Sequence, residues 1–258
     1  MKRTIIFALF LPVCAYAFLT ADVTVVNYFT TPNTLYGLYA EDYHIAGTDP
    51  VDDELKLYNF DGLPYAELPL DYTTYPYPWG FVVVPGPGNF YSDFASNHIY
   101  YGSSGNWHSF VNPAGIHGRG RDYDGQYLWE ADNDYGGDGN GVYRFAPDGT
   151  GAYFFPTPEP QDYLSGLTRF SFGGDEYVMV TAQEDYRFFF YLTDGTYAGC
   201  ASAPFTLSYG YGLDYCDARD TFFFSCVSYG NNCVYELDFD FFVGIDGQSL
   251  GAIKASFR

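Results

Sequence analysis

The stretch of sequence that decides the fold lies near the middle of the chain. It reads Gly120-Arg121-Asp122-Tyr123-Asp124-Gly125-Gln126-Tyr127-Leu128-Trp129-Glu130-Ala131-Asp132, then Gly141-Val142-Tyr143-Arg144-Phe145-Ala146-Pro147-Asp148-Gly149-Thr150, then Ala152-Tyr153-Phe154-Phe155-Pro156. Asp-Gly pairs stand between its short apolar runs. Such pairs are strong hairpin signals, because glycine accepts the positive φ that a tight turn requires. The stretch therefore predicts four short antiparallel strands in succession.

The same order of features recurs along the chain and predicts a repeat fold. Each copy begins at a leading glycine, and these are Gly37, Gly80, Gly120, Gly166 and Gly212. Their spacing of roughly 40 to 46 residues is the blade length of propeller repeats. We therefore predict an all-β protein, a β-propeller of four-stranded blades. Five starts imply five blades, and six is the alternative if a degenerate blade lies within residues 79–118.

The N-terminal and C-terminal segments predict how the ring closes. Residues 22–29 resemble the fourth strand of a blade and precede the first leading glycine, whereas the last copy has an irregular stretch from Phe241 to Gln248. Propellers protect their sheet edges by closing the ring. We expect the N-terminal strand to complete the last blade.

The extreme N-terminus predicts export. Lys2 and Arg3 precede an apolar stretch of about ten residues and an Ala-Tyr-Ala cleavage pattern, which is the order of a signal peptide. We assign residues 1–17 to a signal peptide, 18–248 to one propeller domain and 249–258 to a C-terminal tail. A lipoprotein carrying its lipid on Cys14 is the alternative. No later apolar run is long enough to span a bilayer, so we expect a secreted, periplasmic or cell-surface protein and not an integral membrane protein.

Composition narrows the classes of partner. The chain has 28 Tyr and 25 Phe, residues that favour half-buried pleated surfaces, and its formal net charge is −21. Such a surface repels nucleic acid and suits cations, calcium or a basic partner. A secreted protein can also be acidic simply for solubility.

The four cysteines left after cleavage lie in the last quarter of the chain. An even number in an exported protein predicts two disulfides. Cys226 and Cys233 flank a short loop, so we predict that they form one bridge and, by elimination, that Cys200 and Cys216 form the other.

The repeat Gly-Leu-x-x-Asp-Gly-x-Tyr-Leu-Trp-x-Ala-Asp followed by Val-Tyr-x-Phe-x-x-Asp-Gly resembles the bacterial secreted NHL-type and virginiamycin-B-lyase-like propellers. The similarity is clearest over residues 120–155 and looser over about 33–240. This resemblance implies a fold more than an activity, because such propellers include binding modules, lyases, lactonases and cyclotransferases.

Two groups of residues are candidates for a site. The loop 132–141 offers carboxylate and amide oxygens that suit calcium, and a solvated glycine-rich hairpin is the alternative; the candidate ligands are Asp132, Asp134, Asp138 and Asn140. Aromatic side chains in loops can stack on a sugar or other ligand, and the alternative is that they fill the space between blades; these are Tyr75, Tyr77, Trp79 and Trp107.

Three functions fit these features. The first interpretation is an extracellular propeller that binds a ligand, glycan or protein through loops at one face, without catalysis. The alternatives are a propeller enzyme of the lyase or cyclotransferase type, and a structural cell-surface or self-assembling protein. Acidic groups or histidines that converge at one channel mouth would favour the enzyme. An aromatic groove without titratable groups would favour sugar binding.

Overall fold

Strands make up nearly all the regular structure of the chain. The computed structural model describes residues 17–70, 77–94, 96–103, 106–133, 139–158 and 163–245, and within them the single helical element is the 3₁₀-helix η1, Gly115–His117. The all-β prediction is confirmed. No helix in these ranges has the length and the apolar composition needed to cross a bilayer.

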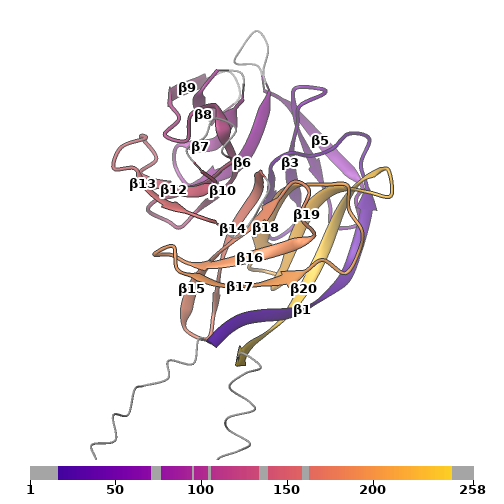
Figure 1. The fold of residues 1–258 in the computed structure, drawn as a ribbon. Coiled ribbons are helices and arrows are strands. Elements are labelled where there is room, and N and C mark those ends of the chain that lie inside the picture. The colour runs from indigo at the N-terminus through magenta and orange to yellow at the C-terminus, as the bar shows by residue number, and fades with distance from the viewer. Residues whose placement is uncertain are drawn as a thin grey trace, which may run out of the picture.

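Three of the sheets have four strands each, in strict sequence order (Figure 1). The first contains β2 (Leu38–Ala40), β3 (Ile45–Asp49), β4 (Glu54–Tyr58) and β5 (Pro64–Pro69); the second β6 (Pro78–Val84), β7 (Gly88–Asp93), β8 (His98–Ser103) and β9 (Asn106–Val111); the third β10 (Gly118–Tyr123), β11 (Leu128–Asp132), β12 (Gly141–Phe145) and β13 (Tyr153–Pro156). The described residues between Pro78 and Val111 thus form one four-stranded sheet.

The fourth sheet has eight strands, in the order β14-β15-β16-β17-β1-β20-β19-β18. It contains β14 (Leu164–Phe172), β15 (Asp175–Ala182), β16 (Arg187–Leu192), β17 (Tyr197–Ser202), β18 (Tyr209–Cys216), β19 (Thr221–Ser228), β20 (Asn231–Ile245) and the N-terminal β1 (Ala17–Thr30). Two runs of four strands meet in it, because β1 is antiparallel to β20 over its length and joins β17 only at the parallel pair Leu19 and Gly199.

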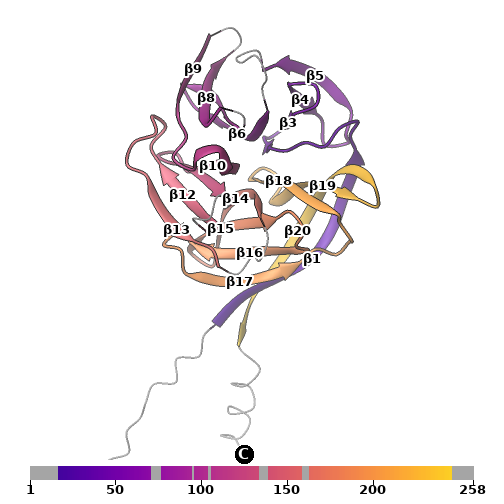
Figure 2. The same cartoon turned by 45° about the horizontal axis from the view of Figure 1, so that its top comes forward.

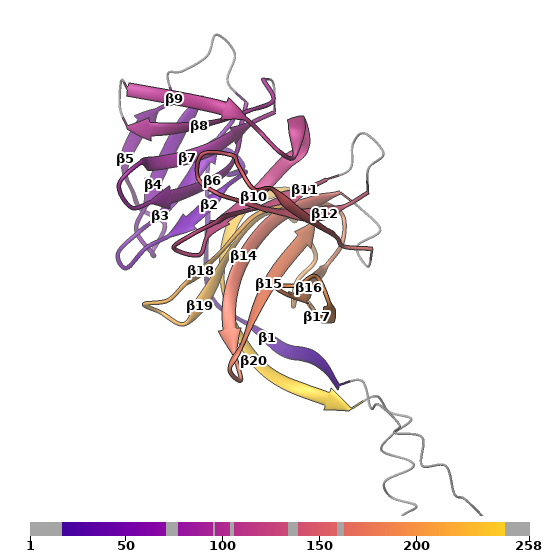
Figure 3. The same ribbon diagram turned by 90° about the vertical axis from the view of Figure 1, so that its left-hand side faces the viewer.

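The closing role predicted for residues 22–29 is confirmed by the pairing of β1 with β20. The irregular stretch predicted from Phe241 is wrong in part, because β20 continues to Ile245 and pairs there with the start of β1. Figure 3 shows the two strands running side by side beyond the rest of the sheet. This pairing supplies hydrogen-bond partners for the backbone N–H and C=O groups of both terminal strands.

The predicted Asp-Gly turns form as expected. Between β10 and β11, Gly125 has a φ of 91°, and the Asp124 carboxylate accepts hydrogen bonds from the backbone N–H groups of Gln126 and Tyr127. Gly149, between β12 and β13 of the same sheet, and Gly195, between β16 and β17 of the eight-stranded sheet, have φ values of 83° and 91°. The aspartate fixes the turn and the glycine adopts its left-handed conformation.

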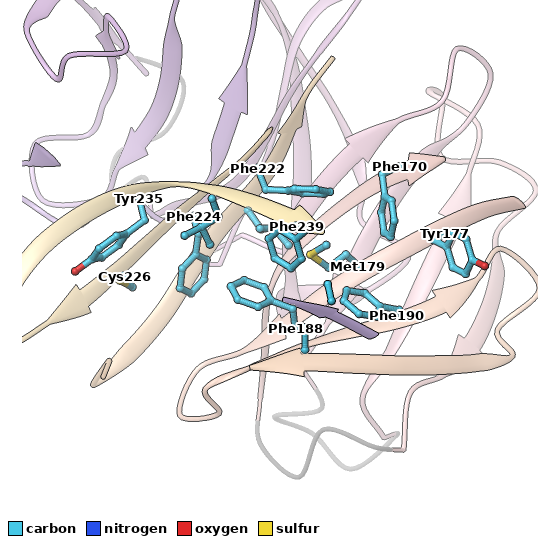
Figure 4. Close-up of a cluster of buried hydrophobic side chains, with 14 of the residues drawn as sticks. Phe170, Tyr177, Met179, Phe188, Phe190, Phe222, Phe224, Cys226, Tyr235 and Phe239 are labelled. Carbon is cyan, nitrogen blue, oxygen red and sulfur yellow. The ribbon is translucent and has the colours of Figure 1, made fainter. Parts of the chain in front are cut away.

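Phenylalanine fills the space between neighbouring sheets. The largest cluster lies between the two halves of the eight-stranded sheet (Figure 4) and includes Phe170, Phe188, Phe190, Phe222, Phe224 and Phe239. Ring pairs such as Phe188 and Phe224 meet edge-on, with centroids 5.3 Å apart. The high aromatic content therefore serves the packing of broad, wedge-shaped interfaces.

Neither predicted disulfide is present between the described cysteines. All four described cysteines are free thiols. Cys226 and Cys233 are directly opposite each other on β19 and β20, but they are not bonded. Cys200 packs against the third and fourth sheets, whereas Cys216 packs against the first sheet, so this second pair is not brought together. Elimination failed because the number of cysteines says nothing about which sheet faces they occupy.

Candidate functional site

The first strands of the sheets form a closed ring around a central axis. Figure 2 shows the sheets arranged about β6, β10, β14 and β18. Each leading glycine touches the backbone of the next inner strand: a Cβ on Gly80 or Gly120 would overlap Arg119 or Leu167, respectively. A Cβ on Gly212 would lie 2.8 Å from the backbone nitrogen of Leu38. The ring therefore closes from β18 back to β2, and the repeated glycine permits the close approach.

Residues two positions after the leading glycines connect successive inner strands. The Asp122 carboxylate accepts a hydrogen bond of 2.6 Å from the Arg169 backbone N–H. Thr168 Oγ1 accepts one of 2.9 Å from the Tyr215 N–H, and Asp214 accepts one of 2.6 Å from the Ala40 N–H. We call these three interactions the ring bonds.

A cavity of about 860 Å³ opens at the end of the ring where these side chains lie. Its walls come from all five inner strands and the turns that follow them, so segments far apart in sequence contribute to one site. We call it the acidic cavity, because seven acidic side chains and one arginine line it: Glu41, Asp42, Asp122, Asp124, Glu176, Asp214, Asp217 and Arg169. None of the residues that line it is a histidine.

Asp122 and Asp214 lie in different electrostatic surroundings. Burial raises the pKa of Asp214 well above its usual range, and the charge of Asp122 raises it further. Burial also raises the pKa of Asp122, to about 6, although the charge of Arg169 and two backbone N–H groups oppose this rise. Arg169 thus favours the ionised form of Asp122, whereas Asp122 favours the protonated form of Asp214.

The Arg169 guanidinium is itself held in place. Its Nη2 lies 3.1 Å from a Glu176 carboxylate oxygen, and its Cζ lies 5.3 Å from the centre of the Trp129 ring. Trp129 is buried, and its indole N–H donates to Asp124 at 2.7 Å. This chain of contacts runs from the third sheet to the rim of the cavity and fixes the guanidinium whose charge acts on the Asp122 carboxyl group.

Aromatic side chains gather at the opposite end of the inner strands. Tyr36, Trp79 and Tyr211 each precede a leading glycine, and their rings contact one another with centroids 4.3 to 6.1 Å apart. Tyr77 joins them, with its ring 5.9 Å from that of Tyr36. We call this cluster the aromatic end.

The predicted ligand-binding aromatics separate into two places. Tyr77 and Trp79 lie together at the aromatic end. Trp107 does not: it lies on β9, the outermost strand of the second sheet, and packs edge-on against Tyr91 at 5.2 Å. A residue on a fourth strand lies far from the axis, so Trp107 belongs to sheet packing. Tyr75 lies outside the described residues.

The predicted calcium loop is described only in part. Asp132 ends β11 and is buried, and Asn140 directly precedes β12. Asp134 and Asp138 lie outside the described residues. Within those that are described, no group of three or more histidine, cysteine or acidic side chains is placed to hold a metal ion.

Comparison with known proteins supports the fold. The sequence matches no family model and no curated protein. Glutaminyl cyclase from Myxococcus xanthus is similar in structure, with a TM-score of 0.66 at 12% identity, over 87% of this chain and 99% of the cyclase. The chain has a β-propeller fold. Virginiamycin B lyase from Staphylococcus aureus is similar at a TM-score of 0.50 and 16% identity, over 83% of this chain and 73% of the lyase.

A third similar structure is the calcium-binding protein regucalcin from Agrobacterium tumefaciens, with a TM-score of 0.53 at 12% identity, over 85% of this chain and 95% of that protein. The predicted resemblance to virginiamycin-B-lyase-like propellers is confirmed at the level of the fold. At these identities the similarity concerns the fold alone, so the activity of this propeller has to be argued from its own residues.

Sequence reasoning missed the two central carboxyl groups, Asp122 and Asp214. They are 92 residues apart, and neither stands within a short catalytic motif. A signal was nonetheless present, because both occupy the second position after a leading glycine. Aligning the repeats on Gly120 and Gly212 places the two carboxyl groups at equivalent points of the ring.

Proposed function

We propose that this chain is a five-bladed propeller enzyme in which Asp122 and Asp214 carry out general acid–base catalysis in the acidic cavity. The blade count rests on the two runs of four strands in the eight-stranded sheet, added to the three separate sheets. The similarity in fold to a cyclase and a lyase favours catalysis over simple binding. Export before folding is part of the proposal and rests on the predicted signal peptide.

The observation that carries the proposal is the unequal environment of the two carboxyl groups. Paired titratable groups whose surroundings separate their pKa values can act as an acid and a base at one pH. Asp122, beside Arg169, ionises first and acts as the base that accepts a proton from the substrate. Asp214 stays protonated and acts as the acid that donates a proton to the leaving atom. The pair then returns to its starting state by exchanging protons with water.

The chemistry expected of such a pair is elimination or intramolecular displacement, in which one bond breaks as a proton moves at each end. General acid–base catalysis of this kind contributes about 10²- to 10⁴-fold in rate. The tyrosine rings at the rim, Tyr39, Tyr123 and Tyr215, offer flat surfaces to a substrate body.

The test is an activity panel on the purified mature protein. A glutaminyl peptide and quinupristin serve as first substrates, because they correspond to the enzymes of similar fold. We expect turnover by the wild type and a loss of at least about 100-fold in Asp122→Asn and Asp214→Asn. Asp217→Asn is the matched control, since it removes the same charge from an exposed position of the same cavity.

A second candidate is a module that binds a cation in the acidic cavity without chemistry. The observation that favours it is the imbalance of seven acidic side chains against one arginine. Spermidine is a suitable probe in calorimetry. A binding module predicts that Asp217→Asn weakens spermidine binding as much as Asp122→Asn does, and that no substrate of the panel is turned over. These two results together would favour the binding module over the enzyme.

A further inference from the structure

Arg119 is a buried cation that has no carboxylate partner among the described residues. It directly precedes Gly120 on β10 and is 2% exposed. Its Nη1 donates to the backbone oxygens of Ile116 and Gly118 at 3.0 Å, and its Nε and Nη2 lie 2.9 Å from the Asn133 side-chain oxygen when that amide faces it. All these acceptors are neutral. No described Asp or Glu approaches the guanidinium within ion-pair distance.

Burial lowers the pKa of Arg119 to about 10, and the more distant charges of Glu130 and Asp132 offset only part of this effect. A buried charge is costly to keep without a partner. The protein keeps this one directly beneath the aromatic end: the Arg119 Cζ lies 4.2 Å from the centre of the Trp79 ring and 4.8 Å from that of Phe94.

The aromatic end contains one buried hydrogen-bond donor that has no acceptor among the described residues. This donor is the indole N–H of Trp79, a residue that is only 6% exposed. The hydroxyl groups of Tyr36 and Tyr77 lie 3.5 Å apart and face each other. Buried donors are nearly always paired in native proteins, so an indole N–H without an acceptor calls for an explanation.

We propose that the aromatic end is a binding site for a carboxylate on a flat or ring-shaped ligand. A carboxylate supplies the oxygen acceptor that the Trp79 indole N–H lacks among the described residues, and it compensates the charge of Arg119. Tyr77 is 38% exposed and offers its ring to the body of the ligand. This site lies at the opposite end of the inner strands from the acidic cavity, whose charge repels a carboxylate, so it does not depend on the proposed catalysis.

The test compares phenylacetate with phenylacetamide, which has almost the same shape but no charge. The chain contains three tryptophans, so the indole N–H region of a ¹H–¹⁵N correlation spectrum of the intact mature protein has one signal for each, and Trp79→Phe identifies that of Trp79. We expect phenylacetate to shift the Trp79 signal and to leave those of Trp107 and Trp129 in place. Phenylacetamide should bind about tenfold more weakly, because a charge-assisted hydrogen bond is worth about twice a neutral one.

Two variants separate the charge from the ring surface. Arg119→Met should weaken phenylacetate about tenfold and leave phenylacetamide unchanged. Arg144→Met is the matched control, because Arg144 also packs against aromatic rings. Its Cζ lies 4.9 Å from the centre of the Tyr127 ring and 5.3 Å from that of Tyr153, but on the third sheet, away from the aromatic end. It should bind both probes as the wild type does.

Equal affinities for the two probes, a shift of all three indole signals, or no shift of the Trp79 signal would each overturn the proposal. The comparison of the probes uses the wild-type protein, so the proposal stays testable even if Arg119→Met does not fold.

Discussion

Thr168 shows that a ring bond does not need a charge. Thr168, Asp122 and Asp214 occupy equivalent positions, and each accepts a hydrogen bond from the backbone of the next inner strand. A neutral hydroxyl group therefore suffices to join two strands. The other two positions hold a half-buried carboxyl group, Asp122, and a buried one, Asp214. Such groups are costly, and carboxyl groups with perturbed pKa values cluster at functional sites. This contrast supports a chemical role for the aspartates beyond joining strands.

The cost of ionising Asp122 predicts how stability depends on pH. Because burial raises its pKa in the folded state to about 6, above that of the unfolded chain, the folded protein loses stability as pH rises from about 4 through about 6. Asp122→Asn keeps an oxygen for the Arg169 N–H and removes the titration. We expect the variant to gain on the order of 2 kcal/mol over the wild type between pH 4 and pH 7.5, measured by urea unfolding. A constant difference across this range would contradict the assignment; Asp217→Asn is the control.

The free thiols of Cys226 and Cys233 predict one disulfide only. Directly opposite residues of antiparallel strands have Cβ atoms about 4.5 to 5.5 Å apart, close to the roughly 3.5 to 4.5 Å of a bridge. Burial raises the pKa of Cys226, so oxidation should be slow in the folded protein. After exposure to an oxidant, peptide mapping without reduction should link Cys226 to Cys233. A link that contains Cys200 or Cys216 would show that the register differs.

At the scale of the strand, the leading glycines predict where the ring tolerates no side chain. In Gly120→Ala, the new Cβ would overlap the backbone of Leu167, and a backbone cannot rotate away as a side chain can. We expect a loss of about 3 kcal/mol or more in thermal or chemical unfolding. Gly173→Ala is the control, because Gly173 has a φ of 64° but nothing within 4 Å, and only about 1 kcal/mol should be lost there. Equal losses in the two variants would mean that the close approach does not matter.

Most of the strands and their order could be predicted from the sequence. The spacing from Gly37 to Gly212 predicted the inner strands, and residues 22–29 predicted the closing strand, because both are local patterns of turns and apolar residues. Tyr77, Trp79 and Trp107 were predicted together as ligand-binding aromatics, but only Tyr77 and Trp79 lie side by side. The sequence could not separate Trp107 from them, since it does not give the distance of a strand from the axis. The acidic cavity was missed because it exists only where five distant strand ends meet.

At the scale of the whole molecule, the ring of inner strands has opposite chemical character at its two ends. Carboxyl groups line the acidic cavity, whereas Arg119 and the Trp79 indole N–H lie at the aromatic end. The difference arises because the inner strands all run in the same direction. Residues just before each leading glycine therefore lie at the aromatic end, and residues two positions after it lie at the acidic cavity. A ligand with separate charges would therefore have one favourable orientation along the axis.

The ring bonds are not spread evenly around the axis, and this predicts where the ring opens first. They join β10 to β14, β14 to β18 and β18 to β2. At the positions of β2 and β6 that are equivalent to Asp122, Thr168 and Asp214, Tyr39 and Val82 make no such bond within the described residues. Side-chain hydroxyl groups join these strands at the other end, where Thr48 donates to the Trp79 oxygen and Ser92 to the Gly118 oxygen. The cavity end of β6 should therefore separate from its neighbours before β14 and β18 do.

Hydrogen exchange and one isosteric variant test this directly. In the wild type, amides at the cavity end of β6 should exchange faster than those of β18. Thr168→Val keeps the shape of the side chain but removes the acceptor of the Tyr215 N–H and the donor to Asp214. Leaving a buried N–H without a partner costs about 1 to 3 kcal/mol, so exchange over residues 209–216 should rise toward the rate of β6. Slower exchange in β6 than in β18, or no change in the variant, would show that packing of the leading glycines alone holds the ring closed.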